Sequence, residues 1–222
     1  MYRSNPHYIF RQGIRIALLM AGLLASLAVS AADMTGSWDT TALTRISVKQ
    51  LGYSTPPSNS ADIADGTYIF KTGNVFSARN IPGTWTQTGA RYTVWPDRPS
   101  LEDSYRTALE TSGGPDDPPV IVNGLRLQST KFGGQQLATS TDPQNASYSL
   151  WGNESYVYWL DIGEGSTRQQ LRVTMTVRVA GVPTPSLAGL TARPLSERAI
   201  NPAKLAAAAV KRYLASSNGA NP

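Results

Sequence analysis

Apolar and polar residues alternate along much of the chain between residues 38 and 180. A period of two is typical of β-strands that bury one face and expose the other. The segment 168–180 alternates most clearly, with Arg172, Thr174, Thr176 and Arg178 on its polar face. Its apolar face carries Leu171, Val173, Met175, Val177 and Val179. The pattern therefore predicts a mainly β protein.

Turn residues divide this pattern into short strands. Gly73-Asn74, Asn80-Ile81-Pro82 and Thr88-Gly89-Ala90 separate strands expected at 67–71, 75–79, 83–87 and 91–95. After a Pro-rich break at 115–119, Gly133-Gly134, Gly152-Asn153 and Gly163-Glu164-Gly165 mark the ends of further strands, expected at 120–132, 146–151, 155–162 and 168–180. Strands this close in sequence pair antiparallel. We expect eight or nine strands in one small closed barrel, or a sandwich, over residues 32–182.

Two segments have a helical period instead. Ser100 and Asp103 resemble a capping box, and the apolar residues that follow predict a helix near 100–111 inside the β domain. A second helix is expected at 203–216, after a Pro-rich connection, so that residues 183–222 form a C-terminal extension. This helix either packs back on the barrel, as we expect, or presents the small residues 206–209 to a partner.

The N-terminal segment has the features of a signal peptide. Arg3, Arg11 and Arg15 precede an apolar run at 16–29 that ends in small residues. The run is shorter than the roughly 20 apolar residues of a membrane span, although an uncleaved anchor would look similar. We expect residues 1–31 to be removed, leaving no membrane span in the mature protein. Together with the absence of cysteine, this favours a bacterial periplasmic or extracellular location.

Composition excludes several chemistries. The chain has no Cys, and its single histidine, His7, lies in the expected signal peptide. Ser-His-Asp triads, Cys-His pairs and His/Cys metal sites are therefore impossible in the mature protein. The carboxylate pairs Glu102/Asp103, Asp116/Asp117 and Asp161/Glu164 are better explained by a helix start, a turn and a strand end. We expect no enzyme, no cofactor and no metal.

Charge argues against two further classes of protein. Removing the signal peptide leaves 17 basic against 15 acidic residues, because three of the 20 Lys and Arg lie within it. The remaining cations are scattered singly along the sequence, so nucleic acid is not an expected partner. Most strands carry too many charges for the lipid-facing band of a membrane-spanning barrel.

Two segments share a Gly-x-Trp pattern at the start of a strand: Gly36-Ser37-Trp38 and Gly83-Thr84-Trp85. With the residues around the second copy, they resemble the lipocalin-like (calycin-type) exported β-barrel proteins of bacteria over residues 34–95. The resemblance implies that Trp38 closes one end of the barrel and that Arg178, from a late strand, packs across its indole. Trp85 would have a similar structural role.

Aromatic residues suggest a binding site. Trp151, Tyr156, Tyr158 and Trp159 lie on two expected strands of one hairpin, with Trp159 on the opposite face from the two tyrosines. They either fill the core or contact a sugar ring or an apolar ligand.

Two functions follow from these patterns. The first is a noncatalytic protein that holds an apolar or amphiphilic small molecule in a barrel cavity of several hundred Å³. The alternative is an envelope protein that binds another protein or a polysaccharide, with a filled barrel and a contiguous exposed patch.

Overall fold

The computed structural model describes residues 32–54, 56–78, 81–111, 119–138, 148–184 and 202–218. The expected signal peptide, 1–31, lies outside the described residues. Residues 33–222 belong to one compact unit. No helix among the described residues is long and apolar enough to cross a membrane.

Eight antiparallel strands form a closed barrel in which each strand pairs with the next and β8 pairs with β1. The strands are β1 (Gly36–Gln50), β2 (Ser58–Lys71), β3 (Val75–Ala78), β4 (Ile81–Thr88), β5 (Arg91–Pro96), β6 (Val122–Ala138), β7 (Tyr148–Ile162) and β8 (Gln169–Pro183). Short 3₁₀ turns, η1 (Thr72–Asn74) and η2 (Gly165–Thr167), join β2 to β3 and β7 to β8. Two helices, α2 (Arg98–Glu110) and α3 (Pro202–Asn218), complete the fold. The predicted mainly β barrel with a mid-chain and a C-terminal helix is confirmed.

Two segments that we expected to form turns, Gly133-Gly134 and Gly152-Asn153, lie inside long strands. Gly133 and Gly134 are within β6, and Gly152 is within β7. A Cβ atom at Gly152 would collide with the hydroxyl of Tyr92, and one at Gly134 would collide with the β7 backbone. The glycines therefore permit close packing inside the barrel rather than a change of chain direction.

The alternating faces of β1 and β8 are confirmed. In β8 the apolar residues 171–179 face the core, and Arg172 and Arg178 face outward. One part of the core is a cluster of aromatic rings whose contacting pairs have centroids 5.0–6.3 Å apart. The cluster contains Tyr68, Phe70, Phe76, Trp85, Tyr92 and Phe132.

The two tryptophans of the Gly-x-Trp segments are buried. The Nε1 of Trp38 donates to the carbonyl of Met34 (3.0 Å), and that of Trp85 donates to the carbonyl of Lys71 (3.0 Å). The expected packing of Arg178 across Trp38 is wrong. Arg178 pairs in register with Leu43 and is exposed on the outer face, whereas Trp38 points inward. The period of two along β8 puts the two side chains on opposite sides of the sheet.

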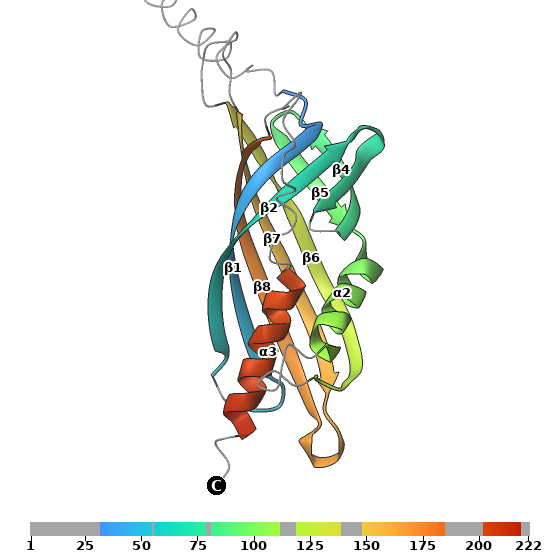
Figure 1. Cartoon of the computed structure of the whole chain (residues 1–222), viewed down its shortest axis with the longest axis vertical. Coiled ribbons are helices and arrows are strands. Elements are labelled where there is room, and N and C mark those ends of the chain that lie inside the picture. Colours follow the sequence, from blue (N-terminus) through green and yellow to red (C-terminus); the bar gives the residue numbers. More distant parts are fainter. Residues whose placement is uncertain are drawn as a thin grey trace, which may run out of the picture. The chain divides into compact units, whose positions relative to one another are not determined.

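The helices cover the side of the barrel that the short strands β3, β4 and β5 leave uncovered. In Figure 1, α2 and α3 lie below the β4–β5 hairpin, between β2 and β6, and the two helices contact each other. Ala206 and Val210 of α3 are fully buried, and the Tyr213 hydroxyl donates to Gln50 Oε1 (3.2 Å). The C-terminal helix therefore packs back on the barrel.

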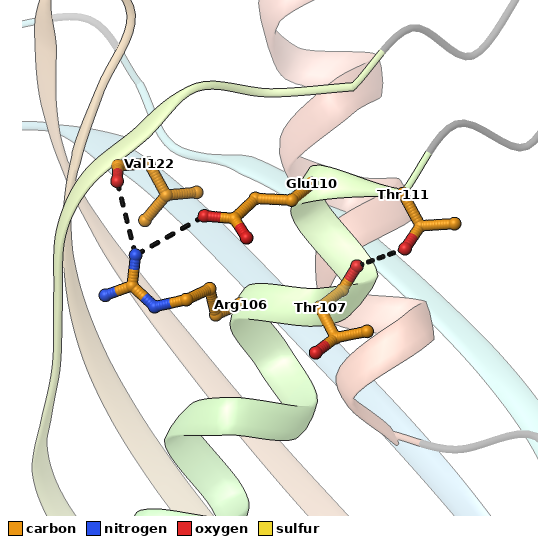
Figure 2. Close-up of polar contacts among 5 residues, drawn as sticks. All are labelled: Arg106, Thr107, Glu110, Thr111 and Val122. Atoms are coloured by element: carbon orange, nitrogen blue, oxygen red, sulfur yellow. Dashed lines mark hydrogen bonds and ion pairs between the residues drawn. The ribbon is translucent and has the colours of Figure 1, made fainter.

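Side chains of α2 bind the edge of β6 where no strand pairs with it. The Leu127 N–H donates to Glu102 Oε1 (2.7 Å), and its carbonyl accepts from Arg98. Figure 2 shows Arg106 donating to the Val122 carbonyl (3.2 Å) while contacting Glu110 (3.4 Å). These contacts satisfy backbone groups that an edge strand would otherwise leave open.

Helix α2 begins earlier than the sequence pattern indicated. Its N-cap is Asp97, whose carboxylate accepts from the N–H (2.9 Å) and hydroxyl (2.6 Å) of Ser100. These hydrogen bonds lower the pKa of Asp97. At the other end the Thr111 hydroxyl donates to the carbonyl of Thr107 (2.6 Å; Figure 2). The expected capping box of Ser100 and Asp103 is therefore wrong, because the helix begins one turn earlier and Asp97 caps it.

Candidate functional site

The structure divides the four aromatic residues of the predicted site between the two faces of β7. Tyr156 and Tyr158 point into the barrel and are 4% and 1% exposed. Trp151 and Trp159 point outward and are 51% and 37% exposed. The predicted separation of Trp159 from the tyrosines is confirmed, and the four residues do not form one site.

The inner face offers almost no free space. Tyr156 and Tyr158 line a cavity of about 20 Å³ together with Phe76, Phe132 and Met175. A cavity of this size holds about one water molecule. It is far below the several hundred Å³ that a small organic ligand occupies.

A buried carboxylate lies beside this cavity. Glu154 is 2% exposed, and its carboxylate accepts hydrogen bonds from the hydroxyls of Tyr68 and Tyr156, the latter at 2.6 Å. Burial raises its pKa to about 7, and the hydrogen bond from Tyr156 opposes this rise. Glu154 was not predicted from the sequence, because the adjacent Gly152-Asn153 was expected to be a turn, although Glu154 lies on the same face of β7 as Tyr156 and Tyr158.

The outer face, in contrast, is hollowed around Trp151. A groove of about 690 Å³ crosses the outer surface of six strands, and we call it the Trp151 groove. Its lining residues are Thr41, Leu43, Ile63, Arg91, Gly134, Gln135, Trp151, Gly152, Asn153, Arg178, Val179 and Ala180.

Strand register explains the shape of the Trp151 groove. Trp151 pairs with Gln135 on one side and with Ala180 on the other, and Ala180 pairs with Thr41. The side chains of Ala180 and Thr41 are small, so the surface is lower there than at the neighbouring indole of Trp151. Leu43 and Ile63 are in register with Arg178 in the adjacent outward row.

The groove combines an aromatic face with polar side chains. The Trp151 Nε1 donates to Ser149 Oγ (3.1 Å), which orients the indole. Arg91 and Arg178 are exposed and form no ion pair with any described residue. An indole face can stack on a sugar ring or an apolar group, and guanidinium groups bind anions through several N–H donors. The lining contains no carboxylate.

Comparisons with known proteins add little to this description. No protein-family model matches the chain, and no curated protein matches it in sequence. Among solved structures, the chain is similar to Ail, the attachment invasion locus protein of Yersinia pestis, with 9% identity and a TM-score of 0.23. The match covers 68% of this chain and 100% of Ail. A likeness at this level does not indicate a shared function.

Proposed function

We propose that the protein is an exported, noncatalytic binding protein that contacts a polysaccharide of the cell envelope through the Trp151 groove. The observation that carries the proposal is the contrast between a filled barrel and an open outer groove. Export is expected from the N-terminal segment. A lipocalin-like barrel would accommodate this function if the ligand binds on its outer wall rather than inside it.

The filled interior argues against a small molecule held inside the barrel. The hydroxyls of Tyr68 and Tyr156 both donate to Glu154 in the core, and Ala203 of α3 lines the small remaining cavity. An interior ligand would therefore require these groups to separate. The outer groove requires no such rearrangement, because Trp151 is already half exposed.

A polysaccharide fits the lining better than a protein partner does. Aromatic faces stack on the apolar faces of sugar rings, while the amides of Gln135 and Asn153 can bond to sugar hydroxyls. A protein interface would have a broader apolar centre with fewer charged residues. In the Trp151 groove, two arginines lie close to the single indole.

Binding to immobilised polymers tests this function. The purified protein is presented with dextran, polygalacturonate and methyl-esterified polygalacturonate, and affinity is measured by biolayer interferometry. We expect at least one polymer to bind. Trp151→Ala should weaken that binding by about tenfold or more, since truncating an aromatic hot spot costs on the order of 2 kcal/mol.

Trp95→Ala is the matched control, because Trp95 is 52% exposed on β5 and does not line the groove. It should bind like the wild type. Equal weakening by both substitutions, or no binding to any polymer, would contradict the proposal. Native mass spectrometry that finds an apolar molecule bound at one copy per chain would favour an interior ligand instead.

A further inference from the structure

Cations gather on the outer wall of the barrel beyond the Trp151 groove. All are exposed, and none forms an ion pair with a described residue. They are Arg45 and Lys49 on β1, Arg126 and Lys131 on β6, and Arg172 and Arg178 on β8. We call this set the basic lane. These cations are scattered singly along the sequence, but the pairing of β6, β7, β8 and β1 brings them together on one wall.

Register orders the central cations of the basic lane along the β1–β8 pair. Arg178 is opposite Leu43, Arg45 is opposite Thr176, and Lys49 is opposite Arg172. Successive outward positions on a strand are about 7 Å apart. From Arg178 to Arg172, the basic lane is therefore about 20 Å long.

At its Arg172 end, the basic lane extends across β7 to β6. Trp159 lies between Arg172 on β8 and Arg126 on β6, with which it pairs directly. The Trp159 Nε1 donates to Gln128 Oε1 (2.6 Å). An exposed indole therefore lies at each end of the basic lane, Trp151 at one end and Trp159 at the other.

A second groove lies on β1, β2 and β8, in the rows between Arg178 and Arg172. Its volume is about 410 Å³, and most of its polar lining consists of hydroxyl groups near Arg45. These polar residues are Ser47, Asn59, Ser60, Thr174 and Thr176. Thr176 pairs with Arg45 and Thr174 with Ser47, between the rows of Arg178 and Arg172. The part of the basic lane between these rows is thus rich in hydrogen-bonding groups.

Acids on the same wall do not neutralise the basic lane. The exposed or half-exposed acids of β1, β2, β6, β7 and β8 are Asp39, Asp62, Asp65 and Asp161, fewer than the cations of the basic lane. Asp65 is in register with Thr41 and accepts from its hydroxyl (2.7 Å), and Asp62 accepts from the N–H of Ile63 (2.8 Å). Asp161 binds Arg168 (2.7 Å), and Asp39 accepts from the Thr184 hydroxyl (2.9 Å). A wall of unpaired like charges creates a positive potential that attracts an anionic polymer.

We propose that the ligand is an anionic polysaccharide that runs along the basic lane. Its carboxylate, sulfate or phosphate groups would contact Arg178, Arg45, Arg172 and Lys49, and its sugar rings would stack on Trp151 and Trp159. This inference rests on the proposed function and adds the charge class of the ligand and a second stacking position.

The spacing of the aromatic residues favours a polysaccharide over a nucleic acid. Trp151 and Trp159 are eight positions apart on β7, which corresponds to about 26 Å. Proteins that bind single-stranded nucleic acids place aromatic side chains where successive bases can stack. Between these two indoles, the lane carries Ser155, Thr174 and Thr176 instead. Hydroxyl groups can form hydrogen bonds with sugars, but they offer no aromatic surface on which bases could stack.

The test compares two polymers that differ in charge alone. Polygalacturonate and its methyl ester have the same backbone, and the ester removes the carboxylate charges. At low salt we expect the wild type to bind the acid form about tenfold or more tightly than the ester. This preference should shrink as the salt concentration rises, because salt screens contacts between exposed charges.

Charge-matched variants locate the binding. Lys49→Gln/Arg126→Gln/Arg172→Gln should abolish the preference for the acid form and lower the slope of log K against log salt by about three. Lys71→Gln/Lys204→Gln/Arg212→Gln removes the same net charge outside the basic lane. This variant should retain the preference for the acid form and the salt dependence of the wild type. All six positions are exposed. Equal thermal unfolding midpoints would show that both variants fold.

Different outcomes separate this inference from the proposed function. If acid and ester bind equally and Trp151→Ala weakens both, the proposed function stands and the anionic ligand is overturned. If both triple variants lose the preference for the acid form equally, binding depends on the net charge of the protein, and the assignment of binding to the basic lane is overturned. If neither polygalacturonate polymer binds but dextran does, the proposed function stands and the anionic ligand is overturned; if dextran does not bind either, both proposals fail. A single-stranded oligodeoxynucleotide that binds more tightly than polygalacturonate, with the same dependence on the lane, would overturn the polysaccharide class.

Discussion

The inner and outer faces of β7 carry aromatic residues in very different surroundings. On the inner face, Tyr156 and Tyr158 are buried, and Tyr156 bonds to Glu154, which leaves almost no free volume. On the outer face, Trp151 is exposed in a groove, and Trp159 is exposed between Arg126 and Arg172. The inner aromatic residues therefore contribute mainly to stability, whereas the outer ones are available to a ligand. Substitutions on each face should separate these two contributions.

The largest effect should come from the aromatic core. Phe70 is fully buried, and its ring lies within 5.0–6.3 Å of those of Tyr68, Phe76, Trp85 and Tyr92. Phe70→Ala should lower the free energy of unfolding by about 3–5 kcal/mol, through lost contacts and the cavity left behind. Urea denaturation measures this change. A loss below about 1 kcal/mol would show that the core collapses around the cavity.

Glu154 should make stability depend on pH. Its pKa in the folded protein, about 7, is above the ordinary value of 4.5 because the carboxyl is buried. The native state therefore binds the proton more tightly than the unfolded state does. Stability should be greatest below about pH 4.5 and should fall by about 3 kcal/mol as the pH rises through 7.

Glu154→Gln provides the control for this pH effect. The amide keeps the size of the side chain but does not titrate, so the fall in stability between pH 5 and 8 should disappear. Denaturation midpoints across this range measure the difference. An unchanged slope in the variant would assign the pH dependence to another group. Tyr158 does not explain it, because burial raises the pKa of this tyrosine above its ordinary value, outside this pH range.

A smaller effect is expected where β7 passes close to Tyr92. Gly152→Ala would push a methyl group against the Tyr92 hydroxyl, and the backbone of β7 cannot easily move because β6 and β8 pair with it. We expect a loss of about 1–3 kcal/mol. The Tyr92 hydroxyl has no hydrogen-bond partner among the described residues. Tyr92→Phe should therefore cost little and should partly rescue Gly152→Ala.

A double-mutant cycle measures this coupling between Gly152 and Tyr92. The free energies of unfolding of the two single variants and the double variant should not add. Strict additivity would mean that the hydroxyl is not what obstructs a larger side chain at position 152.

The smallest change in stability should come from the outer wall. Trp151→Ala removes a half-exposed side chain and should alter the free energy of unfolding by about 0.5 kcal/mol or less. The same substitution is expected to weaken polysaccharide binding strongly. A large loss of stability would indicate that the indole supports the barrel, and would remove the contrast between the two faces.

Much of the fold could be predicted from the sequence, because its signals are local. The period of two in β1 and β8 identified the buried faces, and the recurrence of Leu101, Tyr105 and Leu109 identified α2. Glycine was a less reliable guide. Gly133, Gly134 and Gly152 permit close packing within strands, and this role depends on neighbours far away in the sequence.

The candidate site was predicted only in part. Trp151 and Trp159 were singled out, but so were Tyr156 and Tyr158, which are in the core. Arg178 was selected for a structural role, and it instead lines the outer groove. Residue types alone do not distinguish an aromatic side chain that fills a core from one that faces a ligand.

The sequence by itself determined the strand faces, the helices and the absence of cysteine. These properties depend on residue identity and on short-range periodicity. Only the tertiary structure decided how the faces are used. Pairing of β8 with β1, and of β6 with β7, places Arg126, Arg172 and Lys49 in one row. Register is set by backbone hydrogen bonds between distant segments, so no local pattern specifies it.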